Sequence, residues 1–151
     1  MPAITPGYLY TFFALIAVSS VLMVSFMDYS GAIRLSAEKR SLKNLMDYVA
    51  AKATELLTLT ETTNSTVETF IQAPSAIGNA QYWLRLQNDS SNTWLDGGLG
   101  NVPTEETELR VYLPSGTLAS GYYIGGYGAI RLICFADRNA PHILLSSSNG
   151  G

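Results

Sequence analysis

Few residues in this sequence could bind a metal or attack a substrate. The chain has one histidine, His142, and one cysteine, Cys134. With no second histidine and no cysteine beside it, His142 cannot begin a zinc site, and a single cysteine allows no internal disulfide. We expect His142 to be a surface or strand-edge side chain. Cys134 alternates with Ile130 and Leu132, which is typical of a small residue on a buried strand face. The sequence predicts no metal site and no cofactor.

The remaining polar residues do not form a catalytic pattern either. Acidic residues gather at Glu105, Glu106 and Glu108, but a calcium loop needs alternating oxygen ligands around a central glycine. We expect a solvated loop there. No serine lies in a nucleophile-elbow pattern, and the glycine-rich stretch 121–128 lacks the Lys and Ser/Thr of a phosphate loop. We therefore predict that the protein is not an enzyme.

Aromatic residues are the other candidates for binding. Tyr122, Tyr123 and Tyr127 lie in the glycine-rich stretch, and the two tryptophans are Trp83 and Trp94. These rings could stack on sugars or fill contacts between subunits, and we favour packing in the core and on the sheet surface. Charged residues make up only 14% of the 151 residues, with a net charge of −3. That composition gives no basic patch for nucleic acid, and we predict no nucleic-acid partner.

The N-terminal part of the chain is an uncharged apolar segment. Residues 8–27 contain no Asp, Glu, Lys, Arg or His, and as a helix they would span roughly 30 Å, the thickness of the bilayer hydrocarbon. Thr5 and Pro6 form a suitable helix start. We expect a retained helix rather than a cleaved signal, over residues 6–27. The side chains expected to contact lipid or neighbouring helices are Tyr8, Tyr10, Phe12, Phe13, Leu15, Ile16, Val18, Val21, Leu22, Val24 and Phe26.

An amphipathic segment, residues 28–59, continues this helix. It has no proline, and its apolar residues recur every three or four positions between charged ones. We predict one long helix over residues 1–59 whose second half packs on a folded domain. The stripe expected to make that contact is Leu35, Leu42, Leu45, Val49, Ala53 and Leu56. Residues 60–66 are threonine-rich and predict a hinge after the helix.

The rest of the chain, residues 67–151, predicts a β-rich globular head. Alternating apolar and polar residues between glycine, asparagine and proline turns indicate six or seven short strands. The expected strands are 67–73, 80–87, 93–95, 108–113, 122–124, 129–135 and 142–146. The predicted fold class is α+β, with the long helix followed by a small antiparallel sheet or β-sandwich.

Charge and glycosylation motifs give opposite indications of membrane topology. Four basic residues between Arg34 and Lys43 follow the apolar segment, which by the positive-inside tendency would place the head in the cytoplasm. Two N-glycosylation motifs begin at Asn64 and Asn88 and indicate an outside location. Removal of a short basic leader would reconcile the two, and we prefer that interpretation.

This organisation resembles the lollipop of type IV pilins, and more narrowly archaeal pilins and archaellins. The resemblance rests on the apolar helix 6–27, its amphipathic continuation and a head bearing glycosylation motifs. Bacterial pilins carry a glutamate near the start of the helix, whereas the first glutamate here is Glu38, which favours an archaeal relative. No Lys/Arg-Gly or Lys/Arg-Ala junction precedes the apolar segment, so either the numbering begins on the mature chain or the protein is not processed.

The resemblance implies a structural subunit of an extracellular cell-surface filament. Its partners would be copies of itself, the membrane before assembly, and the pilus assembly machinery. Filament use stays open between adhesion, motility, DNA uptake and cell tethering. The alternative is a membrane-anchored β-sandwich binding module, similar to archaellum stator proteins that contact the surface layer. The long amphipathic continuation favours the filament subunit, because a simple anchor needs only the span.

Overall fold

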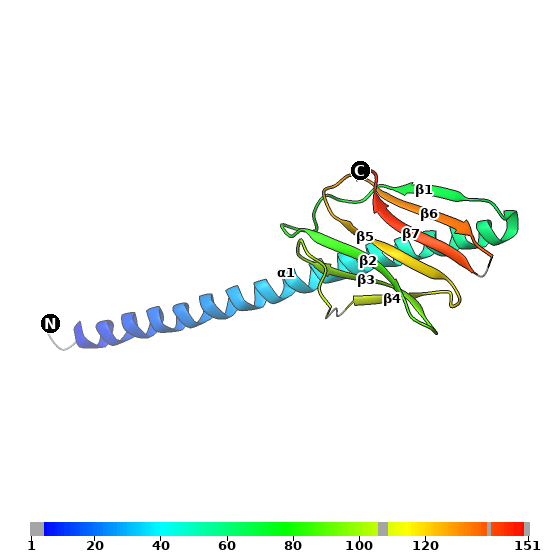
Figure 1. Ribbon diagram of the computed structural model, residues 1–151. Coiled ribbons are helices and arrows are strands. Elements are labelled where there is room, and N and C mark those ends of the chain that lie inside the picture. Colours follow the sequence, from blue (N-terminus) through cyan, green and yellow to red (C-terminus); the bar gives the residue numbers. More distant parts are fainter. Residues whose placement is uncertain (1–4, 106–108, 139, 150–151) are drawn as a thin grey trace. The chain divides into compact units, whose positions relative to one another are not determined.

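The protein has the predicted α+β organisation, one long helix followed by seven strands (Figure 1). The computed structural model describes residues 5–105, 109–138 and 140–149. The helix is α1 (Thr5–Thr63), and the strands are β1 (Val67–Ile71), β2 (Tyr82–Asn88), β3 (Thr93–Leu99), β4 (Leu109–Leu113), β5 (Leu118–Ile124), β6 (Ile130–Ala136) and β7 (Pro141–Ser147). The chain divides into two compact units, Met1–Ala37 and Glu38–Gly151.

Helix α1 ends four residues later than predicted, so the hinge expected at 60–66 is wrong in its first part. Thr58, Thr62 and Thr63 each donate a hydroxyl hydrogen bond to the carbonyl four residues earlier, at 2.7–3.0 Å. Helix geometry thereby satisfies the polar groups that made this stretch resemble a loop. The helix stops at Asn64, whose φ of 51° is left-handed and whose N–H donates to the Thr60 carbonyl at 2.8 Å.

The seven strands form one sheet in the order β1-β6-β7-β5-β2-β3-β4, and not a sandwich. Every neighbouring pair is antiparallel except β5 and β7, which run parallel. Strand β3 extends to Leu99 through two glycines that had predicted a turn. A Cβ on Gly97 would lie 2.6 Å from the Met46 sulfur, and one on Gly98 would lie 2.9 Å from the Trp83 ring. Glycine is needed at both positions because a bulky side chain fills the space over the strand.

Strand β5 changes its partner part-way along its length. Leu118–Gly121 pairs with β7, whereas Tyr122–Ile124 pairs with β2. The change occurs at Gly121, which has a φ of 103° and where a Cβ would collide with the Leu145 carbonyl oxygen. No L side chain tolerates both conditions. The predicted strand 122–124 was therefore too short, because Gly121 reads as a turn in sequence although it lies inside β5.

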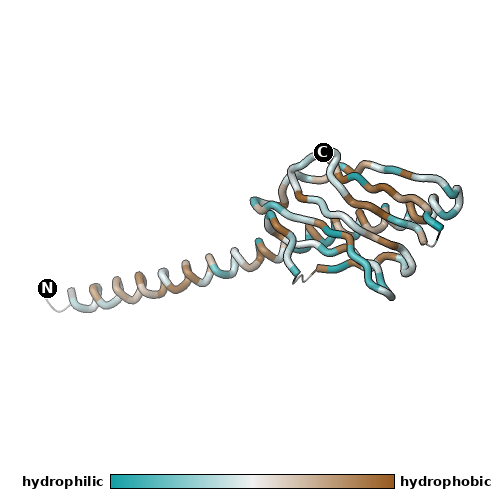
Figure 2. Tube along the Cα trace, viewed as in Figure 1, coloured by the Kyte–Doolittle hydropathy of each residue, from teal (hydrophilic) through white to brown (hydrophobic). Residues whose placement is uncertain are grey.

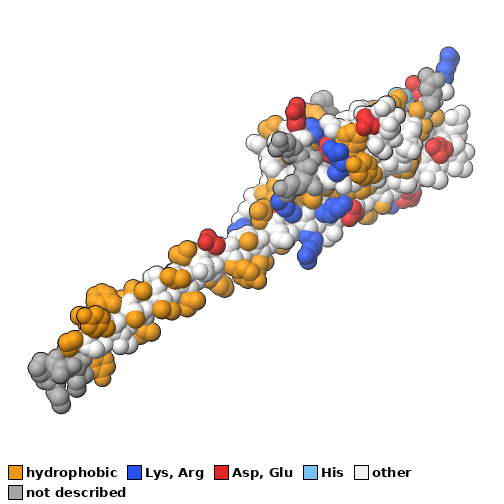
Figure 3. All heavy atoms as spheres, turned by 90° about the horizontal axis from the view of Figure 1, so that it is seen from below, with side chains coloured by type: hydrophobic (Ala, Val, Ile, Leu, Met, Phe, Trp, Pro, Cys, Tyr) orange, Lys and Arg blue, Asp and Glu red, His pale blue; other side chains and the backbone are white. Residues whose placement is uncertain are grey.

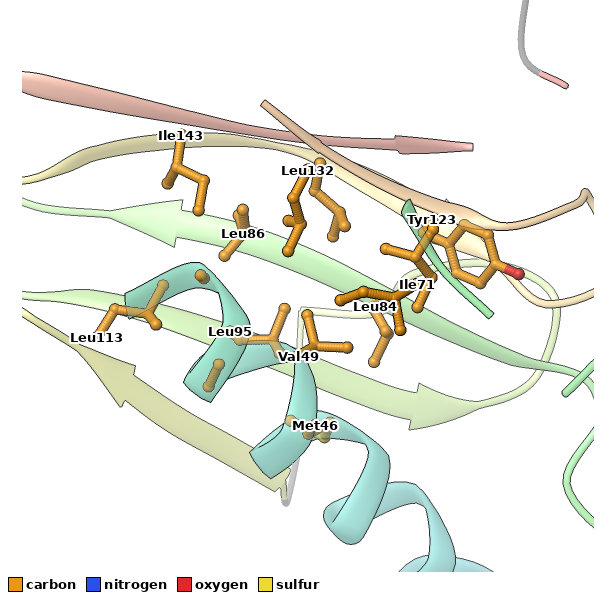
Figure 4. Close-up of a cluster of buried hydrophobic side chains, with 14 of the residues drawn as sticks. Met46, Val49, Ile71, Leu84, Leu86, Leu95, Leu113, Tyr123, Leu132 and Ile143 are labelled. Atoms are coloured by element: carbon orange, nitrogen blue, oxygen red, sulfur yellow. The ribbon is translucent and has the colours of Figure 1, made fainter. Parts of the chain in front are cut away.

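The core of the second unit forms where α1 covers the inner face of the sheet. Figure 4 shows Met46 and Val49 of α1 among the side chains of Leu84 and Leu95 from β2 and β3. Of the predicted packing stripe, Leu42, Val49, Ala53 and Leu56 are buried and Leu45 is half-buried against them. Met46, Ala50 and Leu57, which were not predicted, are buried beside them.

The prediction that Leu35 packs on the head is wrong. Leu35 belongs to the first unit and is 47% exposed. A seven-residue strand spans about 23 Å, the length of about 15 helical residues. The buried stripe from Leu42 to Leu57 has about the same length, and Leu35 comes seven positions before it on the helix.

A matched pair of substitutions on α1 tests this account of the core. Leu42→Ala removes a fully buried side chain and should lower the free energy of unfolding by about 2–5 kcal/mol. Leu59→Ala makes the same change at a helix position that is 43% exposed, and should cost less than about 1 kcal/mol. Denaturant unfolding of the full chain in detergent, followed by tryptophan fluorescence, measures both. Equal losses would contradict the proposed boundary of the core.

Candidate functional site

The surface of the apolar segment, residues 8–27, is the largest candidate for function. Its large apolar side chains are all exposed in the single chain, from 47% for Ile16 to 78% for Tyr10. Figure 2 shows this part of α1 as a hydrophobic stretch of the tube, and Figure 3 shows its orange side chains exposed on the visible face. By length and composition α1 could cross a membrane, and none of its most apolar window is buried.

Two hydroxyl groups within this segment are satisfied by the helix itself. The hydroxyls of Thr11 and Ser20 donate to the carbonyls of Gly7 and Ile16 at 2.9 and 2.8 Å. Such internal bonds allow a polar side chain to enter an apolar environment without leaving an unpaired donor. A shallow hollow of about 330 Å³ lies beside the serines, lined by Phe12, Leu15, Ile16, Ser19, Ser20 and Met23. The small serines leave room there for close approach of another helix.

Leaving this surface in water is energetically unfavourable. Moving one Leu, Phe or Val side chain out of water contributes about 1.5–3 kcal/mol, and the segment carries many of them. The total is on the order of 20 kcal/mol or more, which exceeds the net stability of a typical domain. An environment of lipid tails or of other apolar helices would cover the segment.

A second candidate is a charged and aromatic cluster on the outer face of the sheet. Asp96 of β3 is 1% exposed, and the strand register places it between Arg85 of β2 and Arg110 of β4. Arg85 Nη2 lies 3.3 Å from Asp96 Oδ2, and Arg110 Nε lies 3.1 Å from Oδ1. The guanidinium groups also lie over aromatic rings, Arg85 over Trp83 at 5.3 Å and Arg110 over Trp94 at 4.6 Å.

This cluster was not predicted, because Asp96 precedes two glycines and was assigned to a turn. A signal was present in the sequence. The alternation of apolar and polar residues in each strand places Arg85 and Arg110 on the polar face, and two arginines that lie near each other on one face need a negative partner. A hydrogen bond with Tyr112, and then the contacts with Asp96, raise the pKa of Arg110. Arg85, Asp96 and Arg110, called the triad below, are therefore a charged part of the sheet in which two positive groups surround one buried carboxylate.

Two grooves flank β5 where it changes partner. The β2–β5 groove has a volume of about 470 Å³, and its polar and aromatic lining is Arg85, Gln87, Asn88, Trp94, Ser120 and Tyr122. The β5–β7 groove has a volume of about 510 Å³ and includes Tyr122, Tyr123, Ile124, Tyr127, Ser146 and Ser147. Of the aromatic residues singled out in the sequence, Trp94, Tyr122, Tyr123 and Tyr127 line a groove. Trp83 is buried, as is Tyr123, whose hydroxyl donates to the Gly128 carbonyl.

The scattered reactive residues do not come together into a site. Cys134 is buried in β6 as predicted, and burial raises the pKa of its thiol to about 12, which suppresses the reactive thiolate. His142 was expected to be a surface or strand-edge side chain. It lies in β7, between β6 and β5, so the strand-edge alternative is wrong, while its side chain remains 26% exposed and stacks on Phe135 with centroids 4.9 Å apart. Within the described ranges, no group of three or more His, Cys, Asp and Glu could hold a metal ion. The expected loop acids Glu106 and Glu108 lie outside the described residues.

The two glycosylation motifs differ in their accessibility. Asn64 is exposed and follows the last residue of α1. Asn88 is half-buried at the end of β2, and its Oδ1 accepts a hydrogen bond from the Ala119 N–H at 3.2 Å. Asn88 is therefore less accessible to a glycan than Asn64, and its side chain already connects β2 to β5.

Comparison of the chain with protein-family models, curated proteins and solved structures finds no match. The features of the chain that indicate function are its apolar surface, its charged cluster and its grooves.

Removing the buried carboxylate should destabilise the sheet. Asp96→Ala leaves two arginines without their shared partner and should cost about 3–5 kcal/mol of unfolding free energy. The control is Asp47→Ala, which removes an exposed pair with Lys43 at 3.3 Å and should cost less than about 1 kcal/mol. Thermal or denaturant unfolding of both variants gives the comparison. A small effect at Asp96 would show that the triad adds no stability.

Glycan occupancy should follow accessibility. We expect Asn64 to carry the glycan and Asn88 to be unmodified, which mass spectrometry of glycopeptides from the native protein can establish. Asn64→Gln should then reduce the mass of the protein by the whole glycan, while Asn88→Gln should leave it unchanged apart from the substitution. A glycan found on Asn88 alone would overturn this order.

Proposed function

We propose that this protein is the structural subunit of an extracellular type IV pilus-like filament, in which the N-terminal helices of many copies pack together. The observation that carries the proposal is the exposure of apolar side chains beyond the length of a membrane span. Tyr29, Ile33 and Leu35 are 67%, 52% and 47% exposed and follow the apolar segment on α1. From Tyr8 to Leu35 the helix rises about 40 Å, against about 30 Å for bilayer hydrocarbon.

A helical bundle would cover this whole length, whereas a lipid bilayer would cover only part of it. The core of the second unit begins at Leu42, so these residues are not needed to complete it. In the membrane, lipid tails would surround the apolar segment before assembly. In the filament, copies of the same segment would replace the lipid, and the hollow beside Ser19 and Ser20 would admit a neighbouring helix closely.

Repeated contact between two different surfaces of identical chains produces an open helical polymer. The partners of the chain would be its own copies, the membrane before assembly, and pilus assembly machinery that moves the subunit from lipid into the polymer. The β-rich heads would form the outer surface, and an outside location agrees with the accessible glycosylation motif at Asn64.

A membrane-anchored binding module is the second candidate, because the grooves beside β5 give the head possible binding surfaces. Negative-stain electron microscopy of material sheared from producing cells, with mass spectrometry of the dominant band, separates the two. Uniform thin filaments composed of this chain would support the filament subunit. Recovery of the chain only from detergent-solubilised membranes would favour the anchored module.

Charged substitutions along α1 should abolish filament assembly. Val18→Asp or Leu22→Asp would place an unpaired charge in an apolar bundle, at a cost of several kcal/mol. Because these changes also affect the membrane-spanning part, Ile33→Asp provides the sharper test, since it lies beyond the apolar segment. We expect membrane-located subunit but no filaments from Ile33→Asp.

The control is Ser115→Asp, which adds the same charge at an exposed turn of the head and should leave assembly intact. Filaments are counted by electron microscopy of the sheared fraction, and subunit in the membrane is measured by immunoblotting. Normal filaments from Leu22→Asp would refute a buried helical core. Normal filaments from Ile33→Asp alone would limit the packed region to the apolar segment.

A further inference from the structure

We propose that the β2–β5 groove binds a sugar residue that carries a carboxylate. The groove lies entirely within the second unit, so the proposal does not depend on assembly through α1. Its ligand would be an acidic saccharide such as a uronic or sialic acid, recognised through aromatic, hydroxyl and guanidinium groups.

The sheet opens at this place because β2 and β5 separate. The two strands are paired from Trp83/Ile124 to Arg85/Tyr122. Beyond that pair β5 turns to β7, and the Ala119 N–H is bound by the side chain of Asn88 instead of by the β2 backbone. The opening is fixed by Gly121, whose conformation and close approach to β7 exclude other residues. Its volume of about 470 Å³ falls within the usual range of small-molecule sites, about 300–1,000 Å³.

The lining has the mixed character that a sugar needs. Tyr122 is 60% exposed and gives an aromatic surface against which the C–H face of a sugar ring can pack. Ser120 adds a hydroxyl, which both donates to and accepts from sugar hydroxyls. The Gln87 amide joins the charged cluster, because it donates to Asp96 Oδ2 at 3.0 Å and accepts from Arg85 Nε at 3.1 Å in the orientation that satisfies both groups. An enclosed apolar ligand would leave the Ser120 hydroxyl without a partner, so a polyhydroxylated ligand fits better.

The positive charge in the groove favours a sugar that carries an acidic group. Arg85 is the one charged residue among the described residues that line the groove. Its Nη2 lies 3.3 Å from Asp96 Oδ2 and donates to the Thr104 carbonyl at 3.1 Å, and its side chain, 20% exposed, presents the guanidinium to the groove. Asp96 is buried below the surface, and with Arg110 the triad has a net charge of +1 in a chain whose net charge is −3. A guanidinium held in this way is a preorganised partner for a carboxylate.

A second, independent observation also indicates a missing partner. The indole Nε1 of Trp94, which lines the same groove, is buried and makes no hydrogen bond within the described part of the chain. Buried donors are normally paired, and leaving one unpaired costs about 1–3 kcal/mol. Because less than 1 Å² of this atom is exposed, an acceptor on a bound ligand would reach it only if the indole ring turned toward the groove.

The test compares an acidic sugar with its neutral ester. Purified full-length protein in detergent is titrated calorimetrically with trigalacturonate, triglucuronate and an N-acetylneuraminic acid disaccharide, and with the methyl ester of each. We expect at least one acid to bind and its ester to bind about tenfold more weakly, because the ester retains the ring but lacks the charge. Equal affinity for acid and ester would show that the protein does not recognise the carboxylate. If none of the acids binds, the proposal that the groove is a sugar site is wrong.

Two tyrosine variants locate the binding. Tyr122→Ala should weaken binding of the acid about tenfold or more, because it removes the aromatic surface. Tyr127→Ala, a matched control that is 58% exposed and lines only the β5–β7 groove, should leave the affinity unchanged. Arg85→Lys should keep weak binding but reduce the preference for acid over ester. Thermal unfolding confirms that each variant is folded. Because Tyr122 lines both grooves, loss of binding in Tyr127→Ala would place the ligand in the β5–β7 groove and overturn the proposal.

Discussion

The second unit depends on the contact between one stripe of α1 and the inner face of the sheet. A sheet that is apolar on one face cannot exist alone in water, and this head of fewer than about 90 residues has too little chain to add a second sheet. The helix supplies the missing layer through Leu42, Met46, Val49 and Ala53, which are buried against strands from both ends of the sheet. The space above Gly97 is occupied by Met46, so the strand sequence and the helix sequence are fitted to each other. Each half of the domain therefore requires the other.

The same helix has two kinds of surface, and the change between them divides the molecule. After Leu42 the apolar stripe faces the sheet and polar residues face solvent. In residues 8–27 no side chain is charged, and the large apolar side chains there, like Tyr29, Ile33 and Leu35 after them, are not buried by any described residue of the chain. The apolar side chains of the first part need lipid or other chains to bury them, whereas those of the second part are buried by the sheet of the same chain. A subunit that moves from lipid to polymer would keep its head folded throughout, because the core of the head does not involve the surface that changes neighbours.

Much of this architecture could be predicted from sequence, because the hydrophobic pattern is strong. The uncharged run from Tyr8 to Met27, the three-and-four spacing after Leu42 and the alternation in the strands predict the helix, its buried side and the sheet. Features decided by distant contacts could not be predicted. Gly97 and Gly98 indicate a turn until Met46 and Trp83 are known to lie over them. Asp96 became visible as part of a triad only after the register placed it between two arginines, and the grooves follow from a parallel pair that no local pattern indicates.

The partner change in β5 also has a mechanical consequence. Among the described strands, β5 is the one whose backbone pairs both with the β1-β6-β7 group, through β7, and with the β2-β3-β4 group, through β2. It is held by four residue pairs on one side and three on the other, so it forms a seam across the sheet. Under a pulling force, β5 would separate from its neighbours first, because few backbone hydrogen bonds hold it, if no side-chain contacts joined the two groups of strands. The buried side chains of α1 belong to one hydrophobic cluster with residues from both groups of strands, and so help to hold the two groups together. Resistance of the head to a pulling force is therefore carried by side-chain packing on the helix more than by the continuity of the sheet.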